Sequence, residues 1–196
     1  MNNNILICGV GGQGIVLASK LIALSAMDRG LMARSAETIG MSQRGGSVVS
    51  HVRIGDEVHS PMISTGQADL ILGFEPGEAQ RCLPYLKPDG AIVVCRQSVV
   101  PVTASLGMGN YEGEKTLSYL QQASDDVILV DAATLCRKVG SPKVLNTIML
   151  GAAVRSGKLA LTLDELERAI RTRLPEKFQQ MNLTALHLGA EQEEII

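Results

Sequence analysis

Four glycines at residues 9–14 separate an apolar run from a helical pattern, and this junction constrains the fold more than any other part of the sequence. Residues 5–10 are rich in β-forming residues, and the apolar residues after the glycines recur at helical spacing. The chain is therefore predicted to form a strand, a tight turn and a helix. Gly9, Gly11 and Gly14 fit the spacing G-x-G-x-x-G. Such a turn offers backbone N–H groups to a phosphate, but it also serves simply to pack a helix on a sheet.

Strand and helix patterns alternate along the rest of the chain, which favours a doubly wound α/β fold with a mostly parallel sheet. The alternation at residues 47–54, followed by a turn at 55–56, predicts an antiparallel hairpin within it. Other strands are expected at residues 32–37, 69–74, 91–95 and 126–131, and helices at 15–29, 75–86, 115–123, 132–139, 144–155, 164–174 and 175–190. In the helix at 144–155, Asn146 and Thr147 are expected to leave the apolar face, and Gly151 predicts a close packing contact.

The length of 196 residues suits a single domain, which we expect to span residues 1–190, with an acidic tail at residues 191–196. The net charge of -2 and the aromatic fraction of 3% provide neither a basic patch nor stacking side chains, so nucleic-acid binding is not expected. No apolar run approaches the ~20 residues that cross a bilayer. We therefore expect a cytoplasmic protein that does not associate with membranes.

The reactive side chains do not assemble into a recognisable catalytic set. The four cysteines stand apart with no C-x-x-C pair, so they are predicted to be buried, reduced thiols rather than ligands of zinc or of an iron–sulfur cluster: Cys8, Cys82, Cys95 and Cys136. His51 and His59 lack a paired acid or nucleophile and are predicted to be structural. The sequence contains no nucleophile elbow, P-loop or thiamine pyrophosphate pattern. Such a chain is either a binding protein or one part of a larger enzyme.

A second glycine-rich stretch at residues 38–47 follows no secondary-structure rule. It combines the fixed positive charge of Arg44 with three neutral hydrogen-bonding side chains, Ser42, Gln43 and Ser47. Guanidinium groups pair with carboxylates and phosphates, and glycines expose backbone N–H groups, so the stretch is suited to holding an anion. The alternative is a connection that presses against another subunit.

Glu37 provides the argument for a different function. It falls near the end of the second predicted strand, where dinucleotide-binding folds keep a carboxylate for the ribose hydroxyls. The alternative function is therefore a stand-alone dinucleotide-binding protein that uses the first glycine-rich turn and Glu37.

Taken together, the motif at residues 9–14 and the stretch at residues 37–47 resemble the gamma-type domain of 2-oxoacid:ferredoxin oxidoreductases. The resemblance extends over nearly the whole chain, including Asn146, Leu150 and Gly151, and is closest to the small (beta) subunits of indolepyruvate ferredoxin oxidoreductases. It implies a Rossmann-like three-layer α/β/α domain with a mostly parallel, partly mixed sheet. It also implies an enzyme subunit that is inactive in isolation, although the isolated chain is compatible with a homodimer.

The same resemblance implies a division of labour between subunits. A large partner subunit is expected to hold thiamine pyrophosphate and the iron–sulfur clusters, and the complex to convert an arylpyruvate oxidatively to an acyl-coenzyme A while reducing ferredoxin. No catalytic or metal-binding residue is expected in this chain, which would line the shared site with a possible coenzyme A contact. The expected cofactor-binding residues are Gly9, Gly11, Gly12, Gln13, Gly14, Ser42, Gln43, Arg44, Gly45, Gly46 and Ser47.

Overall fold

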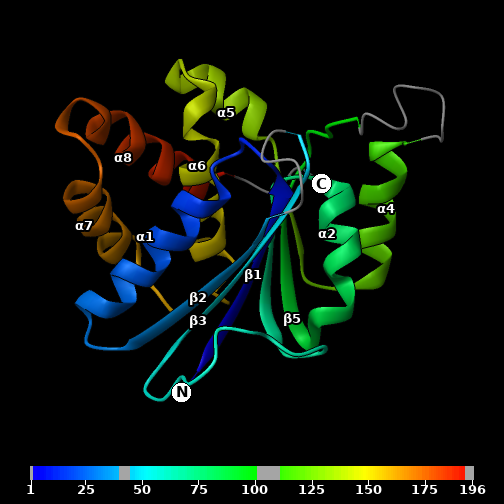
Figure 1. The fold of residues 1–196 in the computed structure, drawn as a ribbon. Helices are drawn as coiled ribbons and strands as arrows, with labels where there is room; N and C mark the ends of the chain where they lie inside the picture. The colour runs from blue at the N-terminus through cyan, green and yellow to red at the C-terminus, as the bar shows by residue number, and fades with distance from the viewer. Residues whose placement is uncertain (1, 40–44, 101–110, 193–196) are drawn as a thin grey trace.

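The computed structural model describes residues 2–39, 45–100 and 111–192, and these form a six-stranded sheet between two layers of helices (Figure 1). The strand order is β2-β3-β1-β4-β5-β6. β3 runs antiparallel to both of its neighbours, whereas the remaining adjacent pairs are parallel. The strands are β1 (Asn3–Val10), β2 (Met32–Ile39), β3 (Ser47–Gly55), β4 (Ala68–Gly73), β5 (Leu86–Cys95) and β6 (Val127–Val130). The predicted α/β fold with a mixed, mostly parallel sheet is confirmed.

Neither of the two antiparallel pairings of the sheet crosses the predicted turn at residues 55–56. β3 ends at that turn and pairs with β2 on one side and with β1 on the other, so the prediction of a hairpin across 55–56 is wrong. The chain after β3 instead crosses the face of that strand. His51 accepts a hydrogen bond from the backbone N–H of Ile63 at 3.2 Å, and Arg53 donates to the carbonyl of Ser60 at 3.0 Å. Side chains of β3 thereby satisfy backbone groups of Ser60 and Ile63 in place of a strand partner.

Helices cover the two faces of the sheet unequally (Figure 1). One face carries α1, α6, α7 and α8, with α5 packed on α6 and α8, while α2 and α4 cover the other. The alternation of β1 divides between the two cores, because Ile5 and Ile7 face α1 whereas Leu6 and Cys8 face α2. The helices are α1 (Ile15–Asp28), α2 (Pro76–Cys82), α4 (Gly113–Ala123), α5 (Ala132–Val139), α6 (Leu145–Arg155), α7 (Leu163–Arg173) and α8 (Glu176–Glu191), with 3-10 turns at Leu83–Tyr85 and Pro142–Val144.

The helix α6 is buried around its whole circumference. A Cβ on Gly151 would lie less than 3.0 Å from the backbone oxygen of Leu186, and one on Gly189 equally close to the oxygen of Ile148. The predicted close contact at Gly151 is therefore confirmed, with α8 as the partner. Asn146 and Thr147, which were expected to leave the apolar face, are both buried, and Thr147 donates to Asn182 Oδ1 at 2.6 Å.

The start of α7 follows a local signal in the sequence. Thr162 accepts a hydrogen bond from the Glu165 N–H at 3.3 Å, and the Glu165 carboxylate accepts from the Thr162 N–H at 2.7 Å. This capping box fixes the start of α7 where it was predicted. No helix in the described parts of the chain is long and apolar enough to cross a membrane.

Candidate functional site

The two glycine-rich stretches meet at the carboxyl end of β1. The Gly11 N–H donates to the Gly46 carbonyl at 2.8 Å, and the Gly45 N–H donates to the Gly11 carbonyl at 3.4 Å. Residues far apart in the sequence therefore form one continuous backbone surface. The predicted residues Ser42, Gln43 and Arg44 lie outside the described residues, so the structure places only Gly45, Gly46 and Ser47 of the second stretch.

This surface lies where the connections of the sheet diverge. The chain leaves β1 through α1 toward β2 on one side, while β4 is the neighbour of β1 on the other. Open α/β sheets bind ligands at such switch points, outside the carboxyl ends of the strands. The position is therefore that of a binding site by topology as well as by motif.

The side chain of Gln13 connects the ends of β1 and β4 at the switch point. Its side-chain Oε1 accepts a hydrogen bond from the Val10 N–H at 2.7 Å, and its Nε2 donates to the Phe74 carbonyl at 2.9 Å. The amide thus joins the turn after β1 to the residue after β4. Because both ends of the amide have backbone partners within this chain, Gln13 shapes the turn from the inside.

The glycines of the first turn have different reasons to be glycine. A Cβ on Gly9 would lie 2.7 Å from Phe74 Cβ, and one on Gly14 would lie 3.0 Å from Asn146 Cβ. At Gly12, by contrast, a Cβ would meet nothing within 4 Å, but the backbone has a φ of 104°. Gly9 is therefore required by packing, and Gly14 by a left-handed backbone with a φ of 86° beside a close neighbour. Gly12 combines a left-handed backbone with open space.

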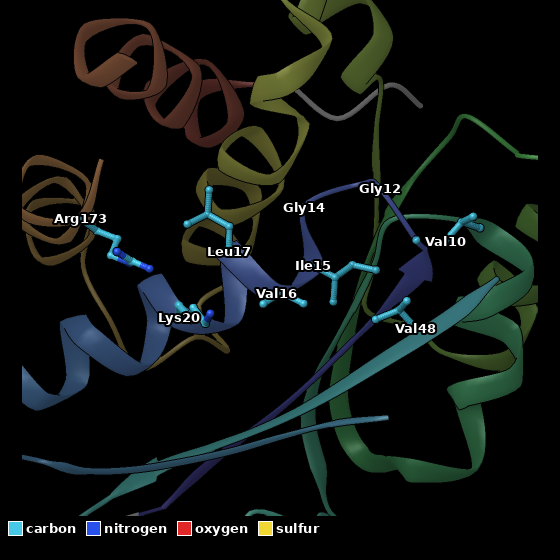
Figure 2. A pocket seen from close by; sticks show the side chains of 10 residues that line it. Val10, Gly12, Gly14, Ile15, Val16, Leu17, Lys20, Val48 and Arg173 are labelled. Carbon is cyan, nitrogen blue, oxygen red and sulfur yellow. The ribbon is translucent and has the colours of Figure 1, made fainter. Parts of the chain in front are cut away.

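A pocket of about 540 Å³ lies beside this turn and along the start of α1 (Figure 2). Gly12, Gly14 and Val48 contribute to its lining, and the side chains of Lys20 and Arg173 point toward the same space. The first turn of α1 has no acidic residue and no side-chain cap. Neither cation forms an ion pair with another described residue. A helix N-terminus flanked by two such cations favours an anion.

A second pocket, of about 570 Å³, is lined by Gln13 together with residues of β5 and α5. Two of its polar lining groups bond to each other, since the Cys95 thiol donates to Gln97 Oε1 at 3.1 Å. Gln97 Nε2 also donates to Asp131 Oδ1 at 3.1 Å, outside the pocket lining. Burial raises the pKa of Cys95 to about 12. The thiol therefore stays protonated and is not a nucleophile at neutral pH.

The pKa values of the remaining cysteines are shifted in different directions. Cys8 and Cys82 are buried, and the hydrogen bond that the Cys8 thiol donates to Cys82, together with burial, raises the pKa of Cys8, while the same bond lowers the pKa of Cys82. Cys136 is partly exposed, and burial raises its pKa too. The described residues contain no cluster of three or more histidine, cysteine or acidic side chains that would hold a metal ion.

Two buried carboxylates beside the glycine-rich surface were not recognised from the sequence. Glu75 and Glu78 lie at the start of α2, with 3% and 7% of their surface exposed. The Ser47 hydroxyl donates to Glu78 Oε2 at 2.6 Å, and the Tyr111 hydroxyl donates to Glu75. The local sequence predicts only a helix start at Pro76, because the partners of these acids come from distant segments.

Glu37 is not placed as a dinucleotide-binding carboxylate would be. It is exposed on the edge strand β2 and pairs with Ser50 of β3, so a whole strand separates it from β1. Two strand spacings amount to roughly 10 Å. Dinucleotide-binding folds place the acidic strand directly beside the first strand, so this geometry does not favour the alternative function.

The structure gives the two histidines different surroundings, and His59, which was expected to lack a paired acid, lies beside one. His51 is buried, bonds to the Ile63 N–H and makes an edge contact with the ring of Tyr85. His59 is exposed and lies 3.0 Å from a carboxylate oxygen of Glu57.

Residues 4–192 match the family described as pyruvate ferredoxin/flavodoxin oxidoreductase. The chain belongs to this family. It is 35% identical to indolepyruvate oxidoreductase subunit IorB of Pyrococcus horikoshii, over 95% of this chain and 93% of that protein. It also resembles the crystal structure of a keto/oxoacid ferredoxin oxidoreductase gamma subunit from Geobacter sulfurreducens, with a TM-score of 0.70, 26% identity and 96% of each chain covered.

The same fold occurs inside a longer chain. The 2-oxoglutarate:ferredoxin oxidoreductase of Magnetococcus marinus matches with a TM-score of 0.71 at 19% identity, over 96% of this chain and 30% of that one. The family resemblance read from the two glycine-rich stretches is confirmed. The relatives are subunits of oxidoreductases, which also confirms the predicted enzyme class.

Proposed function

We propose that this chain is the small subunit of a 2-oxoacid:ferredoxin oxidoreductase that acts on arylpyruvates such as indolepyruvate. The observation that carries the proposal is the identity of 35–36% to two IorB subunits along almost the full length of both proteins. The geometry supports a subunit role, because the joined glycine-rich stretches form one backbone surface at the switch point of the sheet. We call this surface, formed by residues 9–14 and 45–47, the glycine-rich wall. A larger subunit completes the site on the other side of this wall.

The division of labour follows from the side chains that the chain offers. The large subunit holds thiamine pyrophosphate and the iron–sulfur clusters, which supply the decarboxylation chemistry and the electron path to ferredoxin. Three of the four cysteines of this chain are buried, and their described surroundings contain no metal-ligand cluster. In the overall reaction, the 2-oxoacid and coenzyme A give an acyl-coenzyme A, carbon dioxide and a proton, while two ferredoxins each take up one electron.

The contribution of this chain is to bind and orient an anion. The phosphates of coenzyme A fit the pocket in which the start of α1, Lys20 and Arg173 face the same space (Figure 2). Lys20 and Arg173 would hold the charge, and the N–H groups of the first turn would fix its orientation. Gly12 leaves the backbone open for this approach.

The proposal is tested by co-expressing the chain with a candidate large subunit that carries thiamine pyrophosphate and iron–sulfur clusters. We expect the two chains to purify together, and indolepyruvate-dependent reduction of ferredoxin to require both chains and coenzyme A. The chain alone is expected to show no 2-oxoacid oxidation. A large subunit that is fully active without this chain, or a pair that does not associate, would contradict the proposal.

A further inference from the structure

Two buried carboxylates link the glycine-rich wall to the opposite layer of the sheet. Glu75 and Glu78 are almost fully buried at the start of α2, on the face away from α1. Burying a charge is unfavourable unless partners compensate for the lost hydration. The partners of these two acids therefore show what the structure gains from keeping them.

Glu78 fixes the end of the second glycine-rich stretch. One carboxylate oxygen accepts the hydroxyl of Ser47 at 2.6 Å, and the other accepts Arg81 Nη1 at 2.7 Å. Ser47 directly follows Gly46, whose carbonyl accepts the Gly11 N–H. A continuous path of bonds thus runs from α2 through Ser47 to the first glycine-rich turn.

Glu75 fixes the start of α2 and the chain around it. Its Oε2 accepts the Glu78 N–H at 3.0 Å as a helix cap, and its Oε1 accepts the Val99 N–H at 3.4 Å and the Tyr111 hydroxyl. Tyr111 in turn accepts the Gly77 N–H at 3.2 Å. Burial and the neighbouring carboxylate raise the pKa of Tyr111, so its hydroxyl remains a donor. Glu75 therefore holds Glu78 in place and draws the segments after β5 and before α4 to the same point.

We propose that Glu78, supported by Glu75, is a positioning residue for the shared site, and that it acts through Ser47 on the paired backbone of Gly11 and Gly46. This inference rests on the proposed function. The carboxylates do not line the pocket at the start of α1. They hold the wall in the shape in which coenzyme A and the large subunit meet it.

Steady-state kinetics of the assembled complex test whether the bonds from Glu78 through Ser47 to the first glycine-rich turn position the site. Glu78→Gln and Ser47→Ala are each expected to raise the KM for coenzyme A about tenfold while kcat stays within about twofold, because a misplaced wall weakens binding before it affects chemistry. Ser47→Thr keeps the hydroxyl and is expected to restore the KM. The double variant is expected to be no worse than Ser47→Ala alone, because both changes break the same link. Additive effects, or an unchanged KM, would overturn the proposal.

The matched control is Glu167→Gln on α7. Glu167 bonds to His187 at 2.6 Å and lies 3.9 Å from Arg171, so the substitution also removes an acid with a basic partner, but away from the wall. We expect it to leave the KM unchanged. An equal rise in KM in this variant would show a general effect of lost charge and would overturn the positioning role.

Hydrogen exchange on the full-length chain gives a readout independent of activity. The amides of Gly11 and Gly45 are expected to exchange at least tenfold faster in Glu78→Gln and in Ser47→Ala, with a melting temperature close to that of the parent chain. Unchanged exchange would overturn the positioning role whether or not the complex is active. Faster exchange in a chain whose parent complex oxidises no 2-oxoacid would support the positioning role and reject the proposed function.

Discussion

Glycines occur in two regions of this protein for opposite reasons. At the crossing of α6 and α8, Cβ atoms on Gly151 and Gly189 would both collide with the backbone of the other helix. At the carboxyl edge of the sheet, Cβ atoms on Gly12 and Gly45 would meet nothing within 4 Å. The first pair brings two helices of the same chain together, whereas the second pair leaves backbone accessible from outside.

The surroundings of a glycine therefore indicate whether it serves the stability of the fold or a function. A glycine that is packed against the chain's own backbone is explained by the fold. An open glycine with a left-handed backbone, such as Gly12 with a φ of 104°, supports no contact of its own in the described structure. Its position at the switch point indicates that its partner is a ligand or another subunit.

The largest expected effect is at the helix crossing. Gly151→Ala forces α6 and α8 apart, because the new methyl group would collide with the backbone oxygen of Leu186. We expect a loss of about 3 kcal/mol in the free energy of unfolding and a fall in melting temperature of roughly 6–12 °C, measured by circular dichroism. Thr184→Ala, on the exposed side of α8, is the control and is expected to change stability by less than about 0.5 kcal/mol. A Gly151→Ala protein as stable as the parent would contradict the claim that the close contact between α6 and α8 requires this glycine.

Gly12→Ala tests the role of the open glycines at the edge of the sheet, with Gly30→Ala as a matched control. Both positions have positive φ and open space around the missing Cβ, but Gly30 lies at the opposite end of α1. Each substitution is expected to reduce stability by about 1 kcal/mol through backbone strain. Only Gly12→Ala is expected to reduce kcat/KM of the assembled complex, by about tenfold, because misplacement of a site wall affects turnover. Equal activity of the two variants would show that the open glycine has no functional role.

A smaller effect is expected from the cations beside the first glycine-rich turn. Lys20→Gln and Arg173→Gln should each raise the KM for coenzyme A about threefold, because each removes part of the field that favours an anion at the start of α1. The effect should weaken at high ionic strength. Arg171→Gln on the same helix as Arg173 is the control, since Arg171 lies near Glu167 rather than at the pocket. A KM that responds equally to Arg171→Gln would point to general surface charge.

The smallest effect concerns the second pocket, where the Cys95 thiol is buried and donates a hydrogen bond to Gln97. The folded-state pKa of Cys95, about 12, lies above the ordinary value of 9.0. The unfolded chain therefore loses the thiol proton first, and the free energy of unfolding falls as the pH rises from about 9 toward 12. The loss is expected to stay below about 1 kcal/mol at pH 9.5 and to be absent below pH 8. Urea titrations of the parent and of Cys95→Ala should show a shallower alkaline decline in the variant; parallel declines would contradict the assignment.

The sequence was sufficient where the deciding information is local. The strand, turn and helix around Gly9 and Gly14 follow from periodicity and glycine chemistry, and the capping box at Thr162 marks the start of α7. The alternation of β3 predicted a strand, but its partners could not be read from it. Pairing with β2 and β1 depends on where the distant strands lie, so the hairpin at residues 55–56 was predicted wrongly.

The candidate site also contains residues that the sequence indicates and residues that only the folded structure brings together. The family resemblance correctly joined the two glycine-rich stretches, as the bonds between Gly11 and residues 45–46 show. Lys20 and Arg173 were missed because they are separated by most of the chain and meet only in the folded protein. Glu78 was missed because an acid near a helix start is ordinarily solvated, and only the tertiary contact with Ser47 reveals its burial.

The central claim is that the glycine-rich wall faces another subunit, and a hydrogen-exchange footprint of the complex tests it most directly. Exchange is compared between the full-length chain alone and the chain bound to the large subunit. We expect the strongest protection at residues 9–14 and 45–49, with little change at residues 151 and 189 in the α6–α8 crossing. Protection confined to other surfaces, such as the exposed edge strand β2, with unchanged exchange at both glycine-rich stretches, would contradict the account.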